Sequence, residues 1–595
     1  MSFFETLRLR LGSINALPIL SAIGFLVGLL AGGVVILFRL FIESGFVSWH
    51  SDAGAIGYEA APWWFRLFLP LVGGFLVGYV LYRVGKERSQ VGVGYVLERM
   101  SFHQGYLSWR NALVQFIVGG MTLASGQSVG REGPGIHLGS TAGSWLGQQL
   151  KLPNNSIRIL VGCGTAAAIS ASFNTPLAGV IFAMEVVMME YTVASFIPLI
   201  LSSVTAAILS RIVFGNDIAF IVPSLELSSL WEIPYFIFLG VIIGAIASFF
   251  IKATGVLTKA VKDWPIWVKC GVAGTCVGII ALKVPQVMGI GYDSVNAALH
   301  GSLSVQVLAL AFVGKLLATI ICSSMSLPGG VIGPSMFIGA MIGGFLGAVG
   351  GFIFPTVASD YAFYSMIGMA AMMSAVLQAP LAALLALLEL TNNPNILLPG
   401  MLALVISNLV ASQVFKQTSI FQSQLKIKGL ELKVNPLSQF LRSVGVAGLM
   451  ERKIAVSERR TVFGIAEKLL TDTPRWILIK DENIPISLMA ANDLARYIME
   501  TTEQEESVKT DENNDVLDTV QTTLQEREID LLDIPARRHN IASVYLQANL
   551  EEALDTMERE SVRAVYIYRT TAPMTDKIYG VLTRETIESH YSYKK

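Results

Sequence analysis

The segment Gly130-Arg-Glu-Gly-Pro-Gly-Ile-His-Leu-Gly-Ser-Thr-Ala-Gly-Ser-Trp-Leu-Gly147 lies between apolar stretches and has a second version 200 residues later. That version reads Gly330-Val-Ile-Gly-Pro-Ser-Met-Phe-Ile-Gly-Ala-Met-Ile-Gly-Gly-Phe-Leu-Gly347. The Gly-Pro step, three later glycines at four-residue spacing and the leucine keep the same register. A Gly-Pro step that opens a helix inside a membrane produces a broken helix, whose free amides must face a ligand or water. Two such breaks in matched halves indicate a transport site near the middle of the bilayer.

Composition places most of the chain in a membrane. The 595 residues are 53% hydrophobic and 15% charged, with a mean hydropathy of +0.57, which is too apolar for a soluble protein of this length. Apolar runs fill the region from about Leu17 to Phe415, and the longest can cross a bilayer. Beyond Lys416 the chain becomes charged. We therefore expect a membrane domain over residues 1–430 and a linker over 431–442 before a soluble tail.

Further landmarks recur in the same order and extend the repeat. Thr175-Pro-Leu-Ala178 leads to Glu185, and Ala379-Pro-Leu-Ala382 leads to Glu389. Upstream, Gly92-Val-Gly-Tyr95 is echoed by Gly289-Ile-Gly-Tyr292. Residues 65–215 and 265–415 are therefore expected to be two copies of one all-α unit of broken helices. The alternative, that Gly-x-x-x-Gly spacing only helps helices pack, explains the glycines but not the shared proline and glutamate landmarks.

Arg131 and Glu132 place an acid and a base at the first break. Ionisable groups between apolar segments are costly and are functional by default. Helix N-termini carry partial positive charge and unpaired amides, so a carboxylate there occupies the place of an anion. We expect Glu132 to compete with a permeant anion and to leave when protonated. The alternatives are a structural pair with Arg131, or a helix-start acid without a transport role.

The second break carries no charge. Its amides at Gly330, Val331 and Ile332 suit a weakly held anion, as conduction requires. No metal cluster or nucleophile–base set is present in the sequence, so a membrane enzyme or receptor is the weaker alternative. Lys315 lies in an apolar run and is expected either to line a positive vestibule or to snorkel. The histidines, which lack ligand partners at useful spacing, are expected to be satisfied or interfacial: His103, His137 and His300.

These residues resemble the CLC family of chloride channels and proton-coupled chloride antiporters. Gly130–Pro134 matches the family's GREGP motif with its gating glutamate at Glu132, Ala171–Glu185 is similar to the segment that follows, and Gly330–Pro334 is similar to the GxFxP motif. The resemblance covers about residues 15–430. It implies a homodimer, one anion pathway per subunit, two inverted repeats, and helix N-termini that converge on the anion. The anion-binding positions that it implies are Gly92, Gly130, Arg131, Gly133, Gly330, Val331, Ile332 and Phe421.

The sequence departs from the family pattern at the central anion site. Val91 stands in place of the coordinating serine, Ile332 in place of the GxFxP phenylalanine, and Phe421 in place of the central tyrosine. Two hydroxyl donors are thereby lost, those of the serine and the tyrosine, and each lost donor to a dehydrated anion costs about 1.5–3 kcal/mol if nothing replaces it. We expect a weak central site held mainly by backbone amides, and another small anion such as fluoride or bicarbonate remains an alternative substrate.

A further departure concerns proton coupling. The family's antiporters often carry an inner glutamate directly after the position of Glu185, and here that residue is Val186. Because valine cannot carry a proton, we expect a passive channel gated by Glu132. A proton/chloride antiporter remains the alternative, with water or Glu185 as the inner relay. Glu185 has a structural alternative too, since its echo at Glu389 suggests a role in capping or pairing.

The tail shows two mixed α/β units, expected over 443–500 and 531–595, joined by an acidic linker over 501–530. They resemble the pair of CBS domains that many family members carry. The family's nucleotide-contacting pattern is only partly kept, so Asp493 and Thr583 are the candidate contacts for an adenine nucleotide. A structural dimerisation module without nucleotide is the alternative.

Arg8 and Arg10 precede the first apolar run, which favours a cytosolic N-terminus. The tail follows no export signal and is placed in the cytosol as well. We expect an integral protein of a bacterial inner membrane that has chloride or another small anion, membrane lipid and a second copy of itself as partners. No nucleic acid, metal or resident cofactor is expected, apart from the candidate nucleotide.

Overall fold

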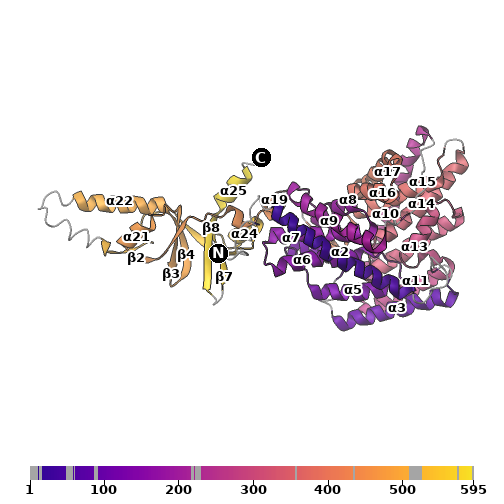
Figure 1. Cartoon of the computed structure of the whole chain (residues 1–595), viewed down its shortest axis with the longest axis horizontal. Coiled ribbons are helices and arrows are strands. Elements are labelled where there is room, and N and C mark those ends of the chain that lie inside the picture. Colours follow the sequence, from indigo (N-terminus) through magenta and orange to yellow (C-terminus); the bar gives the residue numbers. More distant parts are fainter. Residues whose placement is uncertain are drawn as a thin grey trace. The chain divides into compact units, whose positions relative to one another are not determined.

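The computed structural model describes residues 11, 17–47, 58, 61–85, 91–215, 220, 229–355, 358–432, 436–507, 525–571 and 575–592. The chain divides into two compact units (Figure 1). The helical unit comprises Leu17–Leu150 and Ser156–Val434. The tail unit comprises Asn435–Lys595, with Met1–Ala16 and the short segment Lys151–Asn155.

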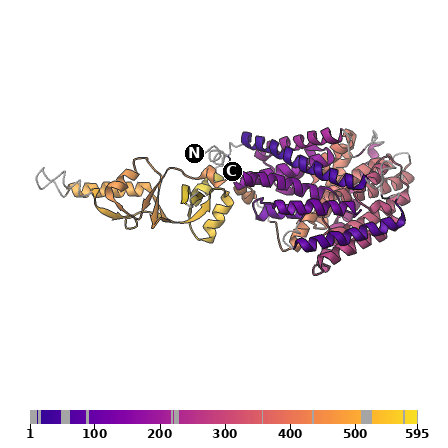
Figure 2. The same ribbon diagram turned by 60° about the horizontal axis from the view of Figure 1, so that its bottom comes forward.

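The helical unit is built of long helices, several of which lie side by side in Figure 2, and of short helices between them. Nine helices of the described residues are long and apolar enough to cross a membrane. The first half contains α2 (Leu17–Val47), α3 (Trp63–Val84), α4 (Val93–Phe102), α5 (Trp109–Ala124), α6 (Glu132–Gln149), α7 (Asn154–Phe173), α8 (Pro176–Phe182), η3 (Ala183–Met188) and α9 (Val193–Phe214). The second half contains η4 (Leu230–Glu232), α10 (Ile233–Ala260), α11 (Ile266–Lys283), η5 (Pro285–Val287), α12 (Tyr292–Leu299), α13 (Val305–Ser324), α14 (Ile332–Ile353), α15 (Tyr361–Leu377), α16 (Pro380–Thr391), η6 (Pro394–Ile396), α17 (Leu397–Leu409), η7 (Val410–Val414) and α18 (Ile420–Ile427).

The two halves correspond helix by helix. The sequence landmarks place α3 to α9 opposite α11 to α17, and the order of elements also pairs the preceding helices α2 and α10. Both Gly-Pro steps lie in the first turn of a helix, one in α6 and the other in α14. N–H groups of the first turn have no intrahelical partner, so the N–H that proline lacks costs the helix no hydrogen bond. The predicted broken helices are therefore present in both halves.

The spaced glycines also pack helices, as the alternative interpretation held. A Cβ atom on Gly139 of α6 would lie 2.3 Å from the carbonyl oxygen of Gly164 of α7. In the second half, a Cβ atom on Gly339 of α14 would lie 2.2 Å from the carbonyl oxygen of Gly368 of α15. Both pairs of backbones touch, so the same spacing serves the repeat and the close packing.

The tail unit contains a six-stranded sheet in the order β1-β3-β4-β6-β7-β8, and a two-stranded sheet of β2 and β5. The strands are β1 (Ile454–Glu458), β2 (Arg460–Val462), β3 (Trp476–Asp481), β4 (Ile484–Ala490), β5 (Glu528–Asp530), β6 (Arg538–Tyr545), β7 (Ala564–Thr571) and β8 (Thr575–Thr583). The helices are α19 (Pro436–Ser443), α20 (Val446–Leu449), α21 (Phe463–Leu469), α22 (Ala491–Ser507), α24 (Leu550–Arg559) and α25 (Arg584–Ser592). Parallel β1–β3 with antiparallel β3–β4 is repeated by β6–β7 with β7–β8, and β4 pairs with β6 between them. Two α/β units therefore share one sheet.

Two expected linkers are partly structured. The segment expected as a linker over 431–442 includes most of α19. The acidic segment over 501–530 begins inside α22, which reaches Ser507, and ends in β5, which pairs with β2. Composition alone therefore made the acidic linker too long at both of its ends. At its start, α22 packs Leu494 and Ile498 into the core although the last turns of this helix are acidic. Residues 508–524 lie outside the described part of the chain.

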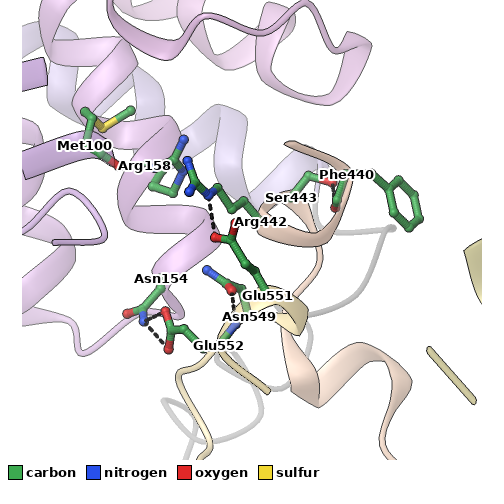
Figure 3. Close-up of polar contacts among 9 residues, drawn as sticks. All are labelled: Met100, Asn154, Arg158, Phe440, Arg442, Ser443, Asn549, Glu551 and Glu552. Atoms are coloured by element: carbon green, nitrogen blue, oxygen red, sulfur yellow. Dashed lines mark hydrogen bonds and ion pairs between the residues drawn. The ribbon is translucent and has the colours of Figure 1, made fainter. Parts of the chain in front are cut away.

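In the tail unit, several polar contacts gather at the start of α24 (Figure 3). Asn549 caps this helix, its Oδ1 accepting the N–H of Glu552 at 3.0 Å. The Glu552 carboxylate accepts two hydrogen bonds from Asn154, at 2.9 and 3.2 Å. Arg442 of α19 forms an ion pair with Glu551. These contacts hold Lys151–Asn155 and α19 to the second α/β unit.

Candidate functional site

The two breaks meet backbone to backbone. The N–H of Gly130 donates to the carbonyl of Gly330 at 2.7 Å, and the N–H of Gly330 donates to the carbonyl of Gly130 at 2.7 Å. A Cβ atom on Gly133 would lie 2.7 Å from the Cα of Gly330, so only glycine permits this approach. The starts of α6 and α14 therefore face one small space.

Glu132 occupies that space. Its side chain is completely buried. Oε1 accepts the hydroxyl of Tyr292 at 2.6 Å, and Oε2 accepts the N–H of Gly333 at 3.3 Å. A Cβ atom on Gly330 would lie 3.2 Å from Oε2. The carboxylate thus lies at the facing N-termini of α6 and α14, where partial positive charge and free amides are available.

Arg131 does not pair with Glu132. Its guanidinium donates to the carbonyl of Ser172 at 3.0 Å and lies 3.8 Å from the carboxylate of Glu43. It also lies 5.3 Å from the ring centroid of Tyr292. The alternative of a structural Arg131–Glu132 pair does not match the structure.

Tyr292 is a residue of this site that the sequence did not identify as such. Its only sequence signal was its place in the Gly-x-Gly-Tyr landmark, because nothing local connects it to Glu132, 160 residues away. The hydroxyl reaches the carboxylate from the first residue of α12.

Lys315 positions the segment before Tyr292. Its fully buried ammonium donates to the carbonyls of Val287 and Gly289, at 3.0 and 2.7 Å, and lies 5.0 Å from the ring centroid of Phe337. Lys315 therefore neither lines a vestibule nor snorkels. Its ammonium is buried and donates hydrogen bonds to carbonyls of a neighbouring segment instead.

The amides of the second break have different partners. The Gly330 N–H, expected to face the anion, is taken by Gly130, so Gly330 supplies space and not a donor. Val331 and Ile332 are buried at the start of α14, where helical N–H groups have no intrahelical partner. Of the three amides at Val331, Ile332 and Gly333, that of Gly333 is the one that donates to Glu132.

The remaining anion-binding candidates lie at two other helix starts. Gly92 precedes α4 with φ of 84°, and its N–H donates to Nδ1 of His137 at 3.2 Å. His137 is fully buried, and its Nε2 has no hydrogen-bond partner among the described residues, so it is only half satisfied. Phe421 is buried at the start of α18, which packs against α4. The structure thus brings the segments of Gly92 and Phe421 together.

Glu185 and Glu389 cap each other's repeat. Glu185 accepts the N–H groups of Leu381 and Ala382, at 3.3 and 2.8 Å, at the start of α16. Glu389 accepts the N–H groups of Leu177 and Ala178, at 2.9 and 2.8 Å, at the start of α8. This exchange matches the capping alternative for Glu185. Val186 is buried beside it in η3.

In the tail, Thr583 and Asp493 lie in different surroundings. Thr583 lines a pocket of about 350 Å³, with the basic side chains of His539, Arg563 and Arg584 and the acidic ones of Glu585 and Glu588. Asp493 lies outside that pocket and binds Arg496 at 3.1 Å and the N–H of Arg537 at 3.0 Å. The described residues contain no group of three His, Cys, Asp or Glu side chains that would hold a metal ion.

The chain matches the family model for the voltage gated chloride channel over residues 73–412. It is 33% identical over 396 residues to a putative chloride channel protein ClcB-like of Ralstonia nicotianae, covering 64% of this chain and 91% of the relative. It is 29% identical over 393 residues to the H(+)/Cl(-) exchange transporter ClcA of Vibrio cholerae, covering 63% of this chain and 83% of the relative. The fold is similar to the crystal structure of a eukaryotic CLC transporter, with a TM-score of 0.58, 16% identity, and coverage of 98% of this chain and 99% of that chain. The chain is therefore an integral membrane protein of the CLC family, whose members are transporters or channels and not enzymes.

Proposed function

We propose that this protein is a passive chloride channel gated by Glu132. The observation that carries the proposal is the Glu132 carboxylate, buried between the starts of α6 and α14 and bonded to Gly333 and Tyr292. A charged side chain in this place excludes a permeating anion by occupying its donors. Protonation removes the charge that the helix N-termini stabilise, and so releases the donors to chloride.

The inner side of the site supports uncoupled transport. Val186 cannot carry a proton, and both carboxylate oxygens of Glu185 are bonded to amides of α16. Beside Ile332 there is an apolar void of about 10 Å³, which holds about one water. It is lined by Ile169, Phe173, Thr175, Ala178, Phe182, Ile332, Met336, Met373, Ala386 and Leu390. One water in apolar surroundings is a poor proton relay.

A proton/chloride antiporter is the second candidate. Glu190 favours it, because this carboxyl side chain is only 8% exposed and follows η3, four residues after Val186. It would supply an inner titratable group where the family's inner glutamate is absent. The relative from Vibrio cholerae carries the name of an H(+)/Cl(-) exchange transporter. Fluoride or bicarbonate in place of chloride is a further variant of the same mechanism.

Chloride efflux from liposomes that contain the purified protein, with external pH recorded at the same time, tests the proposal. Chloride flux without proton movement against its gradient is the expected result. Uphill proton movement at a fixed ratio to chloride would instead establish the antiporter, and Glu190→Gln would then be the variant expected to abolish coupling. Repeating the efflux with fluoride and bicarbonate identifies the anion.

We further propose a homodimer with both termini in the cytosol of a bacterial cell and a CBS-type tail. The β-α-β-β-α order of each tail unit and the shared sheet support the tail assignment. The polar pocket at Thr583 has the size and the basic groups to hold a phosphorylated ligand such as an adenine nucleotide. Mass measurement of the detergent-solubilised protein tests the dimer.

A further inference from the structure

The hydroxyl of Tyr292 is the side-chain donor at the position of the Glu132 carboxylate. The distance from this hydroxyl to Oε1 is 2.6 Å, typical of a charge-assisted hydrogen bond, which is about twice as strong as a neutral one. The two positions where the family resemblance places hydroxyl donors hold Val91 and Phe421 instead. Tyr292 therefore supplies a phenol hydroxyl at the site from a different position in the chain.

The ring of Tyr292 is held from several sides. Its centroid lies 6.2 Å from that of Phe173 and 5.2 Å from that of Phe220, in an edge-to-face arrangement with the latter. The Arg131 guanidinium lies against the ring at 5.3 Å. A ring packed in this way stays in place when the Glu132 side chain moves, so its hydroxyl stays at the site.

The backbone before Tyr292 is fixed as well. The N–H of Gly289 donates to the carbonyl of Gly126 at 3.1 Å, which ties this segment to the first repeat. Lys315 donates to the carbonyls of Val287 and Gly289. The donor is thus preorganised, which lowers the cost of binding a new acceptor.

We propose that the Tyr292 hydroxyl is a shared donor: it binds the Glu132 carboxylate in the closed state and the permeating small anion after the carboxylate has left. The inference rests on the proposed role of Glu132 as the gate. It adds a residue that sets anion affinity and the stability of the closed state. Gly333 supplies the backbone donor beside it.

The other charged groups around this hydrogen bond do not duplicate the hydroxyl. Arg131, from the loop before α6, directs one terminal nitrogen to the carbonyl of Ser172 and the other toward Glu43 on α2, while its Nε has no hydrogen-bond partner among the described residues. Lys315, from α13, directs donors to two carbonyls. His137, also on α6, accepts from Gly92 of the segment before α4. Removal of the Tyr292 hydroxyl therefore removes a donor that none of these contacts provides.

Chloride titration calorimetry on the full-length protein in detergent tests the anion role. Glu132→Ala empties the site, and the comparison is with Glu132→Ala/Tyr292→Phe. Loss of a donor to a charged partner is expected to weaken chloride binding about tenfold or more. The matched control is Glu132→Ala/Tyr235→Phe, which removes a hydrogen bond of 2.6 Å to the carbonyl of Leu346 near the far end of α14. The control is expected to keep its chloride affinity.

Liposome flux tests the gating role. Tyr292→Phe alone weakens the closed state, so chloride flux at alkaline pH is expected to rise. The pH of half-maximal flux is expected to move upward by about one unit or more. The two effects have opposite signs: chloride binding weakens when the Glu132 side chain is absent, and chloride flux rises when it is present. General damage to the fold would instead lower both chloride binding and chloride flux.

Equal chloride affinity in Glu132→Ala and Glu132→Ala/Tyr292→Phe would overturn the proposal. Unchanged chloride flux in Tyr292→Phe would overturn it as well. Failure of the gate itself gives a different result. In that case Glu132→Ala leaves the pH dependence of flux as it is in the parent protein, whatever Tyr292→Phe does.

Discussion

Gly130 and Gly330 exchange both of their backbone hydrogen bonds, each N–H donating to the other carbonyl at 2.7 Å. These two residues are equivalent in the repeat, so the contact joins one copy to the other at the same position. It leaves the starts of α6 and α14 facing one space, and their N-termini add their partial charges there. Glu132 from the first copy fills that space, while the second copy has Ile332 at the equivalent position.

Replacing Glu132 by glutamine tests the gate directly. Glutamine keeps the shape of the side chain but cannot ionise, so no charged group competes with chloride. Flux of Glu132→Gln is expected to lose its response to external pH. The measurement is chloride efflux from liposomes over a range of external pH. A pH dependence equal to that of the parent protein would remove Glu132 from the mechanism.

A methyl group on Gly130 is expected to displace the gate without removing its charge. The added Cβ would lie 2.0 Å from Oε2 of Glu132, closer than atoms can approach. Gly130→Ala should therefore raise chloride flux at alkaline pH. The control is Gly351→Ala, because a Cβ there meets no atom within 4 Å. If both variants behave alike, the packing of Gly130 against the carboxylate does not hold the gate closed.

Glu185→Ala and Glu389→Ala are expected to destabilise the protein by similar amounts, about 1–3 kcal/mol each, since each removes a carboxylate bonded to two helix-start amides. Denaturation in detergent measures the loss, with the exposed Glu467→Ala as the control. The ratio of proton to chloride movement should stay unchanged in Glu185→Ala. A change in that ratio would return Glu185 to the proton path.

Lys315→Met is expected to lower stability by about 2–4 kcal/mol, because it leaves the carbonyls of Val287 and Gly289 without a charged donor. The same change loosens the segment before Tyr292, so the pH of half-maximal flux should rise, as in Tyr292→Phe. Unfolding and liposome flux measure the two effects. The exposed Lys283→Met at the end of α11 is expected to show neither.

ATP is expected to raise the melting temperature of the full-length protein, because the pocket at Thr583 presents basic side chains to a phosphate. Arg563→Glu should remove that rise by reversing one of those charges. Lys468→Glu, an exposed change on α21, should leave it intact. An ATP response that survives Arg563→Glu would place the ligand elsewhere, and no response in any protein would leave the tail as a structural module.

The sequence by itself determined the membrane class, the two-copy architecture, the helix breaks and the place of Glu132 at one of them. These features are encoded locally: a Gly-Pro step followed by a helical pattern places the proline in the first turn of a helix, and apolar length decides which segments can cross a bilayer. The α/β alternation of the tail was readable for the same reason. Only the ends of its expected linkers were misplaced, since the last turns of α22 are acidic and have the composition that is typical of a linker.

Tertiary structure alone decided which residues meet at Glu132. Tyr292 is 160 residues away from it in the chain, and Glu185 bonds amides 196 and 197 residues away. Arg131, its neighbour in sequence, turns to Ser172 and Glu43 instead. Sequence patterns report spacing within one helix or strand, whereas these contacts arise because two copies of a unit pack face to face and exchange partners.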